Sequence, residues 1–290
     1  MVSNEDIIRL QLVNGLGRKT ISKILSYIDN KNLKFDNFSD IVKLLKDMNI
    51  KRLKIDKEKI EKDALEILES CKKSKIKIIG LYDSEYPEKL REIEDKPLIL
   101  YVDGDANLLN NDYNIAIVGT RRPSQESYEV SSILAEKLTE ENCCIVSGFA
   151  SGCDEAAHSG CLQAKGRTIA VVPAGHLQTI KNNKVLYNMI LINGGTIVSE
   201  LPPNAKAERN SFIDRNRIIA ALSEGIIVIE GGQQGGTSHT VKFANAYNKP
   251  VAYTKSFSCI GQTTIFNNNI EIIDSFDKLV NFKNKSVKSA

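Results

Sequence analysis

From residue 115 onward, short apolar runs rich in β-branched residues alternate with longer segments of helical periodicity. Buried parallel strands are typically continuous apolar runs, and the crossovers between them are typically helices. The expected strands are residues 115–118, 143–146, 168–172, 195–199, 225–230 and 250–254. The expected helices lie at about 125–140, 154–164, 184–193, 212–223 and 238–247. This alternation predicts an α/β fold, doubly wound around a mainly parallel sheet.

The first 75 residues have a different pattern, and we expect them to form a small all-helical domain. Their apolar residues recur at helical spacing, with helices expected around residues 7–12, 21–28, 39–48 and 57–73. The turn Asn14–Gly17 is similar to a helix-hairpin-helix turn, in which glycines bring backbone amides close to a DNA phosphate. A plain helical turn explains these glycines equally well, so both interpretations stay open. Two short strands are expected in the connection that follows, at 76–82 and 97–102.

Charge is unevenly distributed along the chain. The net charge is +3 over 290 residues, but residues 1–75 carry 17 basic against 12 acidic side chains, and residues 276–290 carry 4 against 1. The region between them has 18 basic against 23 acidic side chains, so it is acidic overall. Nucleic acid could bind there only through a local concentration of positive charge. We expect a helical domain at 1–75, an α/β domain at 76–275 and a basic tail at 276–290, with an amphipathic helix near 272–283.

Bulk composition, 42% hydrophobic and 26% charged, is that of an ordinary globular protein. No apolar run approaches the roughly 20 residues needed to span a bilayer, and the acidic, polar N-terminus differs from a signal peptide. The six cysteines show no spacing typical of a disulfide framework. We therefore expect a cytoplasmic protein with reduced thiols and no membrane contact.

The loops after the expected strands carry the residues that could bind a ligand, because ligands bind at the carboxyl ends of the strands in such folds. These loops are rich in glycine, serine and arginine, and they comprise residues 119–122, 147–152, 173–176, 199–203 and 231–237. None has the G-x-G-x-x-G spacing of a dinucleotide site or the G-x-x-x-x-G-K-[ST] spacing of a triphosphate site. We accordingly expect no cofactor.

Two pairs of arginines point to an anionic ligand. Arg121 and Arg122 lie between a buried strand and the helix expected after Ser124, where backbone amides and guanidinium groups together can hold phosphate. Arg215 and Arg217 lie at the approach of another expected helix to the same edge of the sheet. For Arg121 and Arg122 the alternative is that they are solvated loop charges, and for Arg215 and Arg217 it is that they form surface ion pairs. Four guanidiniums near one sheet edge favour an anionic ligand.

Catalytic residues are sparse in this sequence. Asp154 and His158, four residues apart on an expected helix, could form an acid/base dyad or, more commonly, a structural hydrogen bond with Asp154 as helix N-cap. The neighbouring cysteines include no C-x₂-C pair, so we expect no metal. Ser147 and Ser151 have no base partner and lie in no G-x-S-x-G elbow. We therefore expect a binding protein and not an enzyme.

Several long motifs, in the same order, resemble the DNA-processing protein A (DprA, or Smf) family of bacteria. They include NGLGRKT at 14–20, AIVGTRRPS at 116–124, IVSGFASGCDEAAHSG at 145–160 and FIDRNRIIAALS at 212–223. The resemblance runs from about Leu10 to about Ile273. It implies an extended Rossmann-like domain behind a small helical domain. It also implies a homodimer that binds and protects incoming single-stranded DNA and helps to load the RecA recombinase in natural transformation.

The resemblance also implies which residues bind DNA. Arg121 matches an arginine that contacts a DNA phosphate, and Phe149 is available to stack a base. Between Gly175 and Lys184 the chain departs from the family pattern, although two lysines there can still supply positive charge. The expected nucleic-acid-binding residues are Arg121, Arg122, Ser147, Gly148, Phe149, Lys181, Lys184, Arg215 and Arg217. The winged-helix domain that many members carry is not expected within these 290 residues.

The alternative is a phosphoribohydrolase-like enzyme or sensor of the nucleotide-binding Rossmann group, which holds a nucleoside monophosphate. The loop 231–237, GGQQGGT, resembles the glycine loop of that group, and Glu230 or Glu200 would be its acid. Glu230 stands where that group usually has a proline.

Overall fold

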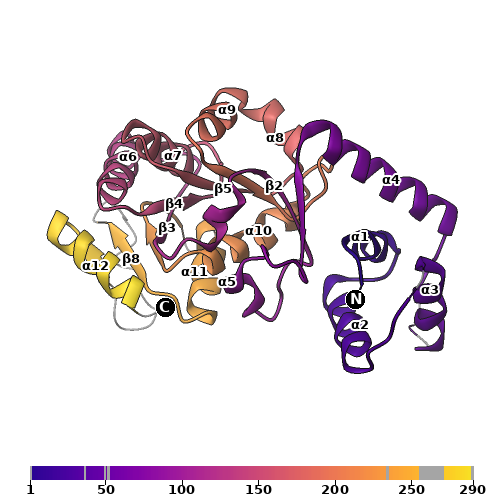
Figure 1. Cartoon of the computed structure of the whole chain (residues 1–290). Coiled ribbons are helices and arrows are strands. Elements are labelled where there is room, and N and C mark those ends of the chain that lie inside the picture. The colour runs from indigo at the N-terminus through magenta and orange to yellow at the C-terminus, as the bar shows by residue number, and fades with distance from the viewer. Residues whose placement is uncertain are drawn as a thin grey trace.

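The computed structural model describes residues 2–35, 37–48, 50, 53–232, 235–254 and 271–288. The chain begins with four helices: α1 (Asn4–Leu12), α2 (Arg18–Asn30), α3 (Phe38–Asp47) and α4 (Lys57–Ser74). Side-chain caps mark the starts of α1 and α4, since Ser3 and Asp6 form a capping box on α1 and Asp56 accepts the Lys59 N–H of α4 at 3.1 Å. Figure 1 shows these indigo and violet helices on one flank of the sheet.

Nine strands of the described residues form one sheet. In chain order they are β1 (Lys77–Gly80), β2 (Ile99–Gly104), β3 (Asn114–Val118), β4 (Cys144–Ser147), β5 (Thr168–Val172), β6 (Thr196–Ser199), β7 (Gly225–Val228), β8 (Val251–Thr254) and β9 (Glu271–Ile273). Their order in space is β1-β2-β6-β5-β4-β3-β7-β8-β9. All pairs from β6 to β9 are parallel, and only β1 and β2 are antiparallel to their neighbours. The predicted mainly parallel α/β sheet is confirmed.

The remaining helical elements connect the strands. They are α5 (Glu88–Arg91), the 3₁₀ turn η1 (Ala106–Asn110), α6 (Gln125–Glu140), α7 (Cys153–Gln163), α8 (His176–Asn182), α9 (Lys184–Ile192), α10 (Arg209–Leu222), α11 (Gly236–Ala246) and α12 (Phe276–Lys288). The short elements α5 and η1 were not expected, and two further differences concern α8 and α10. The sequence did not predict α8, and α10 begins three residues before the expected start at 212. Both differences lie beside the candidate site.

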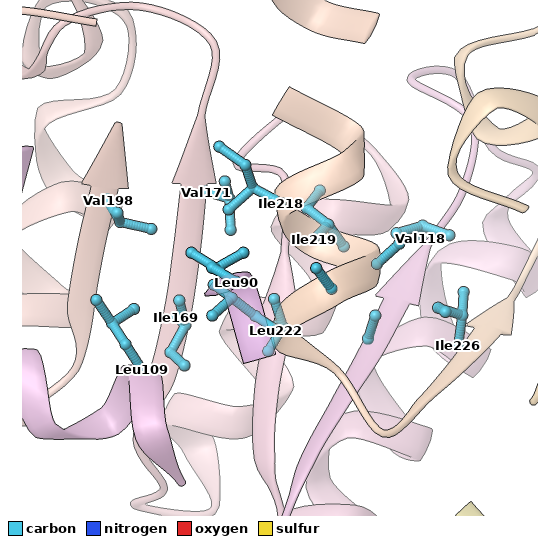
Figure 2. Packing of buried hydrophobic residues seen from close by; sticks show 14 of the residues in the cluster. Leu90, Leu109, Val118, Ile169, Val171, Val198, Ile218, Ile219, Leu222 and Ile226 are labelled. Atoms are coloured by element: carbon cyan, nitrogen blue, oxygen red, sulfur yellow. The ribbon is translucent and has the colours of Figure 1, made fainter. Parts of the chain in front are cut away.

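Helices cover both faces of the sheet because successive strand residues point to opposite sides. Ile115 and Ile117 of β3 belong to a cluster with α6, α7 and α12, whereas Ala116 and Val118 belong to a cluster that contains α10. Figure 2 shows Ile218, Ile219 and Leu222 of α10 packed among the strand residues of this second cluster. This arrangement is the doubly wound fold that the alternating pattern predicted.

The C-terminal segment is more ordered than a basic tail. Residues Ile272 and Ile273, expected to be helical, belong to strand β9, and α12 follows from Phe276. Leu279 and Phe282 of α12 are buried against the sheet. The expected helix is thus present, but it is shifted toward the C-terminus.

The N-terminal helices pack directly on the sheet. One apolar cluster joins α1 to α4 with Leu98, Ile99 and Tyr101 of the β2 region. Lys75, in the left-handed conformation, ends α4, and β1 begins two residues later. Across the parts of the chain that are described, no helix has both the length and the apolarity to cross a membrane.

Candidate nucleic-acid interface

The sheet reverses its order at β3, which pairs with β4 on one side and with β7 on the other. Such a reversal opens a crevice at the carboxyl ends of the strands. A cavity of about 570 Å³ lies there, and we call it the switch-point cavity. Its walls are the loop after β3, the glycine loop after β7 and the first turns of α10. The predicted location of the site, at the carboxyl edge, therefore contains a hollow of suitable size for a ligand.

A second cavity, of about 430 Å³, lies beside the first, and we call it the flanking cavity. Its lining comes from the loops after β4 and β5, from the α8–α9 junction and from α10. Both cavities share Arg121, Ala150, Phe212 and Arg215. The two hollows are therefore neighbours along one edge of the sheet.

Arg121 is exposed at the boundary between the two cavities. The central carbon of its guanidinium lies 4.7 Å from the centre of the Phe212 ring, a cation–π contact that orients the side chain. In the described part of the chain, no carboxylate lies within ion-pair distance of this guanidinium. Its charge is thus available to a ligand in either cavity.

The loop after β4 is built on buried groups. The Ser147 hydroxyl donates to the Ile117 carbonyl at 2.6 Å, and Ser147 is fully buried. Gly148 is required next, because a Cβ there would lie 2.2 Å from Nη1 of Arg215 and 2.5 Å from Oδ2 of Asp154. Phe149 then adopts a positive φ of 61°, an unusual conformation for a bulky residue. Ser147 supports the loop from below and lines neither cavity.

Arg215 supports the same loop from α10. It is 7% exposed and donates to the carbonyls of Val171, at 2.6 Å, and of Gly148. Burial lowers the pKa of Arg215 to about 10, and the Asp154 carboxylate opposes that shift. Burial also raises the pKa of Asp154, against the effect of the Arg215 guanidinium. These two buried, oppositely charged groups both line the switch-point cavity, and Arg215 also lines the flanking cavity.

Arg217 does not lie at the site surface as the sequence led us to expect. It is fully buried, its Nη2 lies 2.7 and 2.6 Å from the two carboxylate oxygens of Glu200, and its Nε lies 3.4 Å from Asp95. Because α10 begins at Arg209, positions 215 and 217 fall in its inner turns. The four guanidiniums expected at one edge are therefore divided between surface and interior.

Two residues at the site were missed by sequence reasoning. Arg209 is exposed in the first turn of α10, and Phe212 follows one turn later; both line the switch-point cavity. A signal for this helix start was present, since Glu208 and Ser211 form a reciprocal capping box. Arg209 occupies the approach position that was expected of Arg215 and Arg217.

The other predicted residues surround the flanking cavity. Phe149 lines it, and its ring packs against Tyr187 at 6.4 Å and His158 at 6.2 Å between centroids. Lys181 and Lys184 are exposed on either side of two asparagines that line this cavity. Arg122 is exposed but lines neither cavity.

The pairing of Asp154 with His158 is wrong, both as a catalytic dyad and as a structural hydrogen bond. His158 places Nδ1 2.8 Å from the Thr168 hydroxyl, whereas Asp154 accepts the Ala150 N–H at 3.5 Å. The N-cap of α7 is Gly152 and not Asp154. Within the described ranges, no group of histidine, cysteine or acidic residues is arranged to hold a metal.

Both acids named for the nucleotide-hydrolysing alternative are engaged elsewhere. Glu230 accepts the Ser124 backbone N–H at 3.0 Å at the start of α6. Glu200 pairs with Arg217 and, at 3.2 Å, with Arg18. Gln233 and Gln234 of the glycine loop lie outside the described residues. Neither of these two acids is therefore free of partners in the described structure.

Comparisons with known proteins identify the family to which the chain is related. A family model described as DNA recombination-mediator protein A matches residues 77–283. The DNA processing protein DprA of Bacillus subtilis is 36% identical over 173 residues, which cover 59% of this chain and 58% of that protein. The chain thus spans little more than half the length of this relative.

Two solved structures resemble the chain. The X-ray structure of DprA from Streptococcus pneumoniae superposes with a TM-score of 0.76 at 26% identity, covering 97% of this chain and 98% of the other. DNA processing protein A from Helicobacter pylori, described for its single-stranded DNA binding mode, superposes with a TM-score of 0.63 at 28% identity, covering 74% and 98%.

Proposed function

This chain belongs to the DNA recombination-mediator protein A family, and on that premise we propose that it binds single-stranded DNA at the two cavities. The observation that carries the proposal is Arg121, an exposed guanidinium at the boundary of both cavities. Phosphates along a strand are the anionic ligand that such a group binds. No catalytic step is needed for this function.

Exposed side chains are proposed to contact the DNA strand, whereas buried side chains support the loops around it. Arg121 and Arg209 neutralise phosphates at the mouth of the switch-point cavity, while Lys181 and Lys184 add charge beside the flanking cavity. Aromatic rings in these walls supply stacking surfaces for bases, which suits single strands because their bases are unpaired. Buried side chains hold the loops in shape: Ser147 and Arg217 line neither cavity, whereas Arg215 lines both.

Family membership supports the finer parts of the proposal. We infer that the protein acts as a homodimer in the cytoplasm, protects incoming single strands and helps to load RecA during natural transformation. A mediator of this kind must bind strands without sequence preference and release them to a recombinase. Contacts through phosphates and stacking meet the first requirement, because neither depends on base identity.

Fluorescence anisotropy with a labelled oligonucleotide tests the proposal. We expect salt-sensitive binding that favours a single strand over a duplex of the same sequence. Arg121→Ala should weaken binding about tenfold or more and reduce the dependence on salt, because one phosphate contact is lost. Arg122→Ala is the matched control, since this neighbouring arginine is equally exposed but lines neither cavity, and it should change the affinity much less.

Equal affinity for single strand and duplex would contradict the proposal. An Arg121→Ala protein that binds like the unaltered protein would show that the strand lies elsewhere.

A further inference from the structure

Core residues form part of the wall of the switch-point cavity. Its lining includes Val118, Ile219 and Thr240, all of which are buried in the core. The volume of about 570 Å³ is ample for one nucleotide.

The charge inside this cavity exceeds what one phosphodiester requires. Arg121 and Arg209 are exposed in its walls, and Arg215 is nine-tenths buried at its back. The Nε of Arg215 has no hydrogen-bond partner among the described residues. Asp154, which also lines the cavity, offsets the charge of Arg215. Two positive charges then remain for a ligand.

The start of α11 adds backbone donors to the same wall. This helix of 11 residues has Gly235 as N-cap, with no side-chain cap and no acidic residue in its first turn. Its first residue, Gly236, lines the cavity, and its carbonyl accepts a hydrogen bond from the Asn216 side chain at 3.0 Å. The N-terminus of a helix attracts anions through its free amides and its dipole.

We propose that the switch-point cavity binds a terminal phosphate monoester, either at the end of a DNA strand or on a free nucleoside 5′-monophosphate. This inference rests on the proposed function of the same site and specifies its ligand. A terminal phosphate has about 1.5 to 2 negative charges at pH 7, whereas an internal phosphodiester has one. Two exposed guanidiniums and a helix N-terminus in one cavity suit the more highly charged terminal group better.

Gly236 allows a selective change. A Cβ at this position would have nothing within 4 Å, so a longer side chain fits. Gly236→Asp puts a carboxylate in the first turn of α11, where it stabilises the helix while it repels a phosphate. Gly236→Asn is the matched control, with the same shape and no charge. Thermal unfolding of both variants shows that the fold is retained.

The test measures anisotropy with three oligonucleotides of one sequence: 5′-phosphorylated, 3′-phosphorylated and unphosphorylated. We expect one phosphorylated end to bind about tenfold more tightly than the unphosphorylated strand, and Gly236→Asp, but not Gly236→Asn, to abolish that difference. In a second arm, thymidine 5′-monophosphate and thymidine compete for the site. If thymidine 5′-monophosphate displaces the strand and thymidine does not, a free nucleotide is a ligand. If the strands differ in affinity but the monophosphate does not compete, the ligand is the strand end.

Equal binding of the three strands, together with no competition by the monophosphate, overturns the inference. The proposed function fails on other results: the unphosphorylated strand does not bind, binds no better than duplex, or binds equally well to Arg121→Ala. The two ideas can thus be rejected independently.

Discussion

Arg121 and Arg217 show how surroundings assign a role to a residue. Both belong to arginine-containing motifs that pointed to DNA. Arg121 is exposed and its guanidinium stacks on Phe212, whereas Arg217 is fully buried between two carboxylates. A guanidinium that is desolvated and paired with acids stabilises the interior, and one at a cavity mouth can bind phosphate.

The buried histidine His158 predicts a dependence of stability on pH. Burial lowers its pKa to about 3, whereas its pKa in the unfolded chain is about 6.5. Between these values the unfolded state binds a proton that the native state does not, so stability is lost as the pH falls below about 6.5. The expected slope is about 1.4 kcal/mol per pH unit for this group.

Urea unfolding at pH 7.0 and 5.5 checks this expectation. His158→Gln should reduce the loss of unfolding free energy between the two pH values, and His239→Gln serves as the control because His239 is not fully buried. His176, whose pKa burial also lowers, will continue to contribute in both variants. An unchanged pH dependence in His158→Gln would contradict the assignment.

At the scale of elements, helix α10 joins the site to the core. Its first turn presents Arg209 to the switch-point cavity, its second turn supports the loop after β4 through Arg215, and its inner face packs on the sheet. Figure 2 shows this inner face, with Ile218, Ile219 and Leu222 toward the strands. One helix therefore carries, at successive turns, a residue proposed to bind DNA, a residue that supports a loop and residues that pack in the core.

Removal of the Arg217 side chain separates these roles. Arg217→Ala leaves Glu200 and Asp95 without this partner, so we expect a loss of about 3–5 kcal/mol in unfolding free energy. The affinity of the folded variant for single strands should stay within about twofold of the unaltered protein. Arg209→Ala should weaken the binding of single strands and change the unfolding free energy little. Chemical denaturation and anisotropy measure the two quantities. If Arg217→Ala instead had a normal unfolding free energy and a lower affinity for single strands, Arg217 would contact DNA.

At the scale of the whole molecule, ion pairs and apolar packing hold the N-terminal helices on the sheet. Arg18, the first residue of α2, lies 3.2 Å from Glu200 and 3.9 Å from Asp214. Lys19 lies 3.7 Å from Glu94. The start of α2, where a helix-hairpin-helix contact with DNA was one interpretation, thus faces acidic groups of the α/β part. This placement favours the plain helical turn.

Loss of the Arg18 side chain should loosen this attachment. We expect Arg18→Ala to lower the protection of amides in α1 and α2 against hydrogen exchange by about fivefold, with no change in α6. Lys23→Ala, an exposed neighbour on α2, is the control. Uniform protection in Arg18→Ala would indicate that the apolar cluster alone holds these helices.

Local patterns in the sequence determined the parallel sheet, its helices and the edge at which the site lies. Strand and helix periodicities are properties of neighbouring residues, and parallel strands must end at one edge. For the same reason Arg121, directly after a strand, could be located from the sequence alone. The helix start at Arg209 was missed because its signal, a capping box, depends on two polar residues outside the apolar pattern.

Only the tertiary structure decided which cations reach the surface. The partners of Arg215 and Arg217 come from distant strands and loops, including Val171, Gly148 and Asp95. Burial and charge pairing depend on how a helix rotates against the sheet, and a start three residues earlier changes which turn carries each side chain. Which residues line the candidate site therefore follows from packing, whereas its position follows from strand order.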